Sequence, residues 1–132
     1  MDHRIVNPWT WQDARMFVQG REVTGEGRVL YCAGIVSVDD NGQPLHEGDV
    51  RAQAMQAFDN LETLLGAAGY TLADVVRLNT YVTDIDDYFA NARPAVHERL
   101  AAAGTRFTAT LLGVSRLALP QFLIEIEATA AA

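Results

Sequence analysis

The segment RVLYCAGIVSV, residues 28–38, constrains the fold most, because it is apolar on both faces of a predicted strand. Its β-branched and aromatic residues favour extended backbone. Alternate side chains form one set of Val29, Tyr31, Ala33 and Ile35 and a second set of Leu30, Cys32, Gly34 and Val36. A strand of this kind is usually covered on both faces. We therefore expect it to lie in a sheet with apolar cover on each side.

Two amphipathic helices are predicted further along the chain. The first spans about 50–68, with Asp49 as a plausible N-cap and Gly69 just beyond its end. Its apolar stripe is Val50, Ala54, Ala57, Leu61, Leu64 and Ala68. The second begins near residue 86, and its stripe is Phe89, Ala92, Val96, Leu100 and Ala103. Pro94 lies inside that pattern and predicts a kink or a fresh helical turn.

The remaining segments read as strands at 16–19, 21–24, 75–82, 107–115 and 122–129. With residues 28–38, the order is β-β-β-α-β-α-β-β, which favours an α+β fold with a mixed sheet and two helices packed on one face. We expect one domain over residues 1–132. Since two helices can cover only one side of the sheet, a neighbouring subunit is the simplest cover for the other.

Composition excludes several function classes. The net charge is −7, there are no lysines, and the ten arginines are scattered, so a nucleic-acid partner is not expected. The three histidines are far apart, so neither a metal site nor another cofactor is expected. No apolar run is long enough to cross a membrane, and the N-terminal residues do not resemble a secretion signal. Together with a single cysteine, Cys32, these features predict a cytoplasmic protein.

Four stretches in this order carry a family resemblance: FVQGREV, VLYCAGIVSVDDNGQ, RAQAMQAFDNLETLLGAAGYTLADVVRLNTYVTDIDDYFA and LIEIEATA. The chain thereby resembles the Rid family (reactive intermediate deaminase, YjgF-like). The resemblance implies a chorismate-mutase-like fold and a homotrimer with small-molecule ligands in clefts between subunits. It also implies hydrolysis of reactive imines and enamines to ketones and ammonia. In such enzymes an arginine clamps the substrate carboxylate, and a water activated near a glutamate attacks the imine carbon.

Site residues carried over from the resemblance match the family only in part. Glu125 stands at the position of the family's glutamate and is the candidate catalytic residue. Ala109 occupies the position of the arginine clamp, Phe17 that of a tyrosine, and Ala33 that of a serine. The resemblance therefore implies a cleft that has lost polar groups, and we count Phe17, Ala33 and Ala109 as substrate-binding positions.

Three further residues are substrate-binding candidates with competing interpretations. Asn91 adjoins Ala92, which holds the position of a family asparagine. Arg106 is either a displaced clamp or a solvated surface arginine; an odd offset of three residues from Ala109 turns its side chain to the opposite strand face, which favours the surface. Cys32 is either a nucleophile in the pocket or a small buried hydrophobe, and the second is commoner.

These residues predict a Rid-type enzyme that hydrolyses or rearranges an imine, an enamine or a related labile intermediate. Without the clamp, small 2-imino acids are poor substrates, and a more apolar substrate lacking that carboxylate is expected. The alternative is a trimer that binds a metabolite without turning it over. An endoribonuclease, the activity named for some relatives, fits poorly with a pI of about 4.7.

Overall fold

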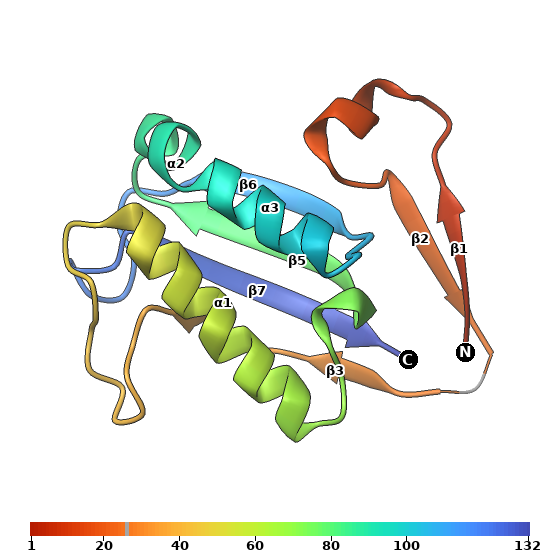
Figure 1. Cartoon of the computed structure of the whole chain (residues 1–132), viewed down its shortest axis with the longest axis horizontal. Coiled ribbons are helices and arrows are strands. Elements are labelled where there is room, and N and C mark those ends of the chain that lie inside the picture. Colours follow the sequence, from red (N-terminus) through yellow and green to blue (C-terminus); the bar gives the residue numbers. More distant parts are fainter. Residues whose placement is uncertain (26) are drawn as a thin grey trace.

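Strand β7 (Ile124–Ala131) lies at the centre of the fold in the computed structural model, which describes residues 1–25 and 27–132. It pairs antiparallel with three strands: β3 (Val29–Tyr31), β4 (Ile35–Val36) and β5 (Val75–Val82). The order is β3-β7-β5-β6, and β6 (Thr108–Gly113) pairs parallel with β5. Three helices lie over this sheet: α1 (Val50–Ala67), α2 (Ile85–Asn91) and α3 (Arg93–Ala102), as Figure 1 shows. The predicted mixed α+β sheet is confirmed.

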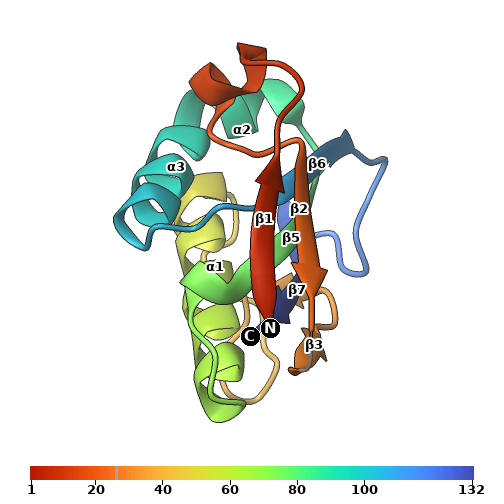
Figure 2. The same cartoon turned by 90° about the vertical axis from the view of Figure 1, so that its right-hand side faces the viewer.

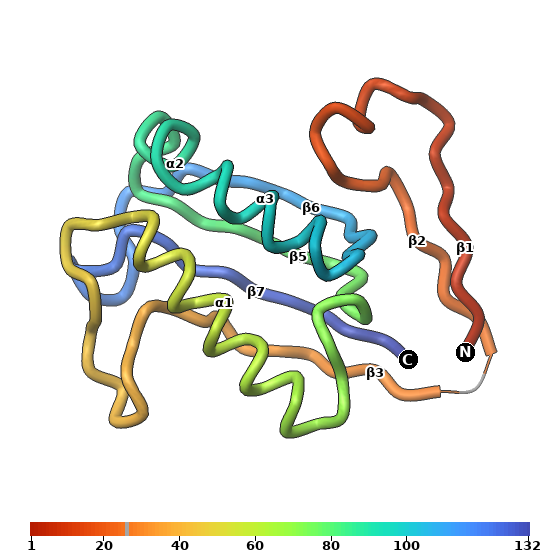
Figure 3. The backbone as a smooth tube through the Cα atoms, viewed as in Figure 1, coloured from red at the N-terminus to blue at the C-terminus, as the bar shows by residue number. Residues whose placement is uncertain are grey.

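The N-terminal residues form a separate two-stranded sheet. Strand β1 (Asp2–Val6) pairs antiparallel with β2 (Gly20–Thr24), so the strand predicted at 21–24 is confirmed. The strand predicted at 16–19 is wrong. Residues Trp11–Arg15 form a 3₁₀ helix, and Met16, with a φ of 60°, takes the left-handed conformation that ends it and interrupts extended backbone. Figure 3 shows this N-terminal hairpin standing beyond the end of the main sheet, with the two chain termini close together.

Helix positions follow the predicted signals closely. The Asp49 carboxylate accepts a hydrogen bond from the Ala52 amide at 2.9 Å, which caps α1. The second predicted helix is divided at Ala92 into α2 and α3, so three helices replace the expected two. The division follows from Pro94, which lies in the first turn of α3, where its missing N–H costs nothing.

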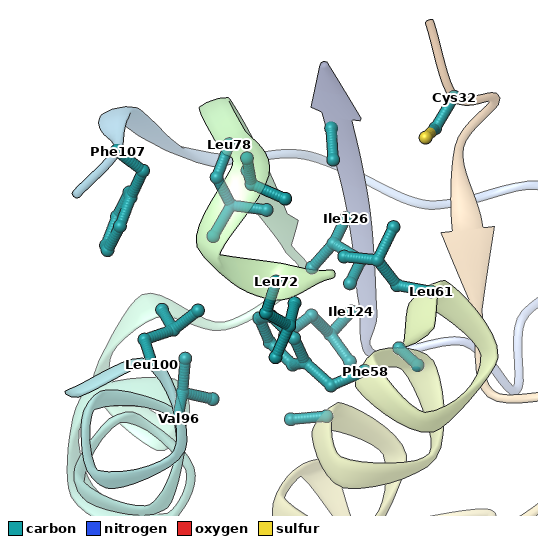
Figure 4. Packing of buried hydrophobic residues seen from close by; sticks show 14 of the residues in the cluster. Cys32, Phe58, Leu61, Leu72, Leu78, Val96, Leu100, Phe107, Ile124 and Ile126 are labelled. Atoms are coloured by element: carbon teal, nitrogen blue, oxygen red, sulfur yellow. The ribbon is translucent and has the colours of Figure 1, made fainter. Parts of the chain in front are cut away.

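The core lies between the helices and one face of the sheet. Side chains from α1, including Phe58 and Leu61, pack against Ile124 and Ile126 of β7, while α3 contributes Leu100 (Figure 4). Figure 2 shows all three helices on that same side of the sheet.

None of the described helices packs on the other face of the sheet. The segment predicted as one strand over 28–38 is broken into β3 and β4, and it exposes Val29 and Tyr31 at 46% and 79% on this face. Polar side chains of β5 and β7, among them Asn79, Tyr81 and Glu125, also lie here. We call this surface the open face. Across the described residues, no helix is long and apolar enough to span a membrane.

Gln53 joins α1 to the segment that enters β7. Its side chain is fully buried and donates to the His46 carbonyl at 3.2 Å and the Gln121 carbonyl at 2.8 Å. It also accepts from the Leu123 amide at 2.8 Å. Three backbone groups of two loops therefore depend on one buried amide.

Replacing Gln53 should destabilise the fold strongly. The Gln53→Leu change keeps the volume but leaves buried backbone groups unpaired, and we expect a loss of about 2–4 kcal/mol in the free energy of unfolding. Urea denaturation followed by circular dichroism measures it. Gln56→Ala on the same helix, which removes only a hydrogen bond to Asn60, is the control and should cost under about 0.5 kcal/mol. Equal losses would contradict this role of Gln53.

Candidate functional site

A cleft of about 450 Å³ lies between helices α2 and α3 on one side and strands β5 and β6 on the other. Its lining residues are Arg15, Phe17, Leu78, Thr80, Tyr88, Phe89, Arg93, Val96, His97, Leu100, Phe107, Ala109, Thr110 and Leu111. The volume lies within the usual range of small-molecule sites. We call this hollow the α3 cleft.

The floor of the α3 cleft is apolar because of the strand register. Ala109 of β6 pairs with Leu78 of β5, so both side chains point toward the helices. Phe107 is buried beside them, and Phe17 closes one end, where its ring meets Trp11 edge-on with centroids 5.8 Å apart. Such a floor suits an apolar ligand surface.

Cationic groups stand on the walls of the α3 cleft. The Arg93 guanidinium lies 4.8 Å from the centre of the Phe89 ring, and its Nε donates to Nε2 of His97 at 3.3 Å. Burial, followed by the nearby charge of Arg93, lowers the pKa of His97 below its usual 6.5. His97 is therefore neutral at pH 7 and accepts this hydrogen bond. Arg15 lies at the opposite end, with its guanidinium 5.5 Å from the centre of the Trp11 ring.

A second group of candidate residues lies on the open face. Glu125 is half-buried on β7, opposite Val36 on one side and Tyr81 on the other. Its carboxylate lies directly against Gly34: a Cβ built there would come within 2.7 Å of Oε1 of Glu125. A side chain at position 34 would therefore displace this carboxylate, and Ala33 adjoins Gly34 as an exposed residue.

The neighbouring carboxylate, Glu127, is held by its own hydrogen bonds. It accepts from Nδ2 of Asn79 at 2.9 Å and from the Tyr81 hydroxyl at 3.1 Å. These two hydrogen bonds lower the pKa of Glu127, and the bond from Asn79 has the larger effect. The structure gives Glu125 no such hydrogen bond among the described residues, so of the two carboxylates Glu125 is the one available to a ligand or water.

The structure divides the sequence-predicted residues between two places. Phe17 and Ala109 line the α3 cleft, whereas Ala33 and Glu125 do not. Ala109 pairs with Leu78 and Glu125 pairs with Tyr81, and these two β5 residues are three positions apart, an odd number. Ala109 and Glu125 therefore lie on opposite faces of the sheet.

Three other candidates lie away from both places. The Arg106 side chain is exposed and lines a separate hollow of about 280 Å³, while its carbonyl accepts from Arg21 at 2.9 Å. Asn91 is exposed and donates to Asp87 at 2.7 Å. Cys32 belongs to the hydrophobic core, and burial raises the pKa of its thiol, so the sulfur stays protonated at neutral pH.

Sequence reasoning overlooked the polar residues of the cleft wall. Arg93 and His97 are four residues apart, a spacing that places both side chains on one helix face, and this was the available signal. Arg15 had none, because its position depends on the 3₁₀ helix before Phe17. Within the described part of the chain, no cluster of His, Cys, Asp or Glu side chains could hold a metal ion.

Known proteins with similar sequences and structures share this fold. The family model for endoribonuclease L-PSP matches residues 13–132. The crystal structure of YyfB of Yersinia pestis, from the conserved Rid protein family, superposes with a TM-score of 0.86 over 100% of both chains, at 37% identity. The chain belongs to the Rid family. The membership predicted from its sequence motifs is confirmed.

Curated Rid-family relatives are more distant. A RutC family protein of Pyrococcus horikoshii is 33% identical in an alignment of 114 positions that covers 79% of each chain. The 3-aminoacrylate deaminase RutC of Acinetobacter baylyi is 29% identical over 75 residues, which are 57% of this chain and 56% of that protein. Such partial matches support the shared family and leave the reaction of this Rid protein to be argued from its own residues.

Substituting Gly34 should displace the Glu125 carboxylate without unfolding the protein. In Gly34→Ala the new methyl group meets the movable end of the Glu125 side chain, so we expect a change in melting temperature of only a few degrees. Any activity that depends on Glu125 should fall about tenfold or more. A crystal structure of the variant shows where the carboxylate lies, a melting curve gives the change in stability, and a rate assay gives the loss of activity.

Gly66→Ala is the matched control for Gly34→Ala. A Cβ at Gly66 meets nothing within 4 Å, and this residue lies within helix α1. It should leave activity unchanged and should not lower stability. A Glu125 carboxylate that keeps its position in Gly34→Ala would show that Gly34 does not determine the placement of this side chain.

Proposed function

We propose that the protein is a Rid-type hydrolase of an imine or enamine, and that each active site is completed by a second copy of the chain. Water adds to the imine carbon, the carbon–nitrogen bond breaks, and ammonia and a ketone are released. Glu125 of one copy takes a proton from the water, and the α3 cleft of the next copy holds the substrate.

The placement of Glu125 and Ala109 on opposite faces of the sheet carries this proposal. One chain alone does not bring its candidate base to its cleft. If the open face of one copy lies against the α3 cleft of another, the two half-sites meet. The two contacting surfaces then differ, and a contact between unlike surfaces gives a ring when the rotation from one subunit to the next closes. The family resemblance favours a ring of three.

Features of the open face support cover by a second copy. Val29 and Tyr31 expose apolar surface there. Exposed apolar surface of this kind commonly marks a contact between proteins.

A binding protein without turnover is the second candidate. The apolar floor formed by Phe17, Leu78 and Ala109 offers no group that would polarise a substrate nitrogen. A ligand could therefore be held in the cleft without reaction. Measuring ammonia release beside ligand binding separates this candidate from the hydrolase.

Glu125→Gln should abolish hydrolysis while keeping the assembly. The amide has the same shape but cannot accept the proton, so we expect kcat to fall at least about a hundredfold. Imine disappearance, with the imine generated by an amino-acid oxidase, measures the rate. Light scattering checks that the mass remains well above the 14.4 kDa of one chain. An unchanged rate would remove Glu125 from the reaction.

Mixing two inactive variants provides the control for the shared site. Ala109→Phe should block the cleft and leave Glu125 intact. After joint refolding of Ala109→Phe with Glu125→Gln, about a quarter of the sites should combine an intact cleft and an intact Glu125 if subunits mix at random. Activity restored to that level supports a site between subunits. No recovery in mixed assemblies would contradict it.

Small 2-imino acids should be hydrolysed poorly by this protein. Ala109 removes the charged clamp from strand β6, and these small acids lack an apolar body to fill the α3 cleft, so for imines derived from serine and threonine we expect kcat/KM to be at least about tenfold below that of an arginine-containing relative. Keto-acid release measures it. Ala109→Arg should raise the rate on these substrates. Equal turnover by the wild-type protein and the relative would show that another residue replaces the clamp.

A further inference from the structure

The charge of the α3 cleft contrasts with that of the whole chain. The chain has a net charge of −7, yet none of the described residues that line the cleft is acidic. Two arginines, Arg15 and Arg93, do line it. A cleft with cationic groups and no carboxylate attracts an anion.

Arg93 is held in a position that leaves donors available. Stacking on Phe89 and the hydrogen bond from its Nε to His97 orient the guanidinium plane. Its two terminal nitrogens make no hydrogen bond or ion pair with any described residue. By contrast, Arg99 is bound by both Asp59 and Glu62. A planar guanidinium with two unused terminal groups is suited to a carboxylate.

Arg15 is the second available cation of the cleft. Its guanidinium lies over the Trp11 ring and has no acceptor among the described residues. It is exposed, whereas Arg93 is half-buried, so Arg93 should contribute more to binding an anion.

The rest of the cleft favours a flat apolar body. Aromatic rings of Phe17, Tyr88, Phe89 and Phe107 come from three parts of the chain and surround one cavity. Aromatic rings pack well against one another in edge-on or offset arrangements. A volume of about 450 Å³ also leaves room for a ligand much larger than a three-carbon acid.

We propose that the α3 cleft binds an aromatic carboxylate, with the anionic group on Arg93, assisted by Arg15, and the ring against the phenylalanines. The anion is then bound by a residue of helix α3, whereas the family's clamp stands at position 109 on strand β6. The sequence predicts a substrate without a carboxylate because Ala109 lacks a charge. The fold changes this expectation, since it brings Arg93 and Arg15 to the same cleft as Ala109. Only the idea that the bound carboxylate is also a substrate rests on the proposed function. Binding itself is measured without turnover.

Calorimetric titration with simple probes tests the proposal. The probes are 3-phenylpropanoate, its neutral amide 3-phenylpropanamide, and propanoate, which lacks the ring. We expect the aromatic acid to bind at least about tenfold more tightly than either comparison compound. Similar dissociation constants for the acid and the amide, or no binding of the acid at millimolar concentration, would overturn the proposal.

Variants then assign the charge to particular residues. Arg93→Met keeps apolar packing on Phe89 and should weaken binding of the acid about tenfold or more, with no effect on the amide. Arg15→Met should weaken it less. Arg106→Met is the matched control, because its guanidinium also lacks an acceptor among the described residues but lines a different hollow. An effect of Arg106→Met equal to that of Arg93→Met would contradict the assignment.

Two further outcomes separate this inference from neighbouring ones. If Arg93→Met dissociates the assembly and the wild-type protein does not bind the acid, Arg93 serves the subunit interface and the proposal fails. If the acid binds through Arg93 but no imine is hydrolysed, the proposed hydrolase fails while the carboxylate site stands.

Discussion

The alternation of β7 is the constraint on which the rest of the structure depends. Ile124, Ile126 and Ala128 are buried beneath the helices, and the residues between them lie on the opposite face. Since β7 pairs with β3, β4 and β5, a shift of one residue would place Glu125 and Glu127 in the core and remove the central apolar layer. One strand thereby sets both the packing and the position of the candidate base.

This constraint also separates the two halves of the proposed site. A sheet has two faces, and the helices occupy the one toward which Ala109 points. Glu125 is consequently left on the face that lacks cover within one chain. The proposed site between subunits rests on this geometry, and the exposed side chain of Tyr31 lies on the same face.

The cationic wall of the α3 cleft shows how an acidic protein can still present positive charge to a ligand. Arg93 is stabilised by an aromatic ring and a neutral histidine rather than by a carboxylate. A salt bridge would have neutralised it and used its donors, as Asp59 and Glu62 do for Arg99. Stacking orients the group without consuming its terminal nitrogens.

The sequence by itself determined the elements that depend on local patterns: helix α1 from Asp49 onward, the alternation of β5 and β7, and the family motifs. It also indicated, through residues 28–38, that one sheet face needs a further cover. Tertiary structure alone decided which candidates meet, because strand register places Ala109 and Glu125 on opposite faces and the turn after Arg15 carries that residue to the cleft. It also decided against the strand at 16–19, since the left-handed conformation of Met16 ends the 3₁₀ helix there. Such features arise from contacts between segments far apart in the chain, which local periodicity does not encode.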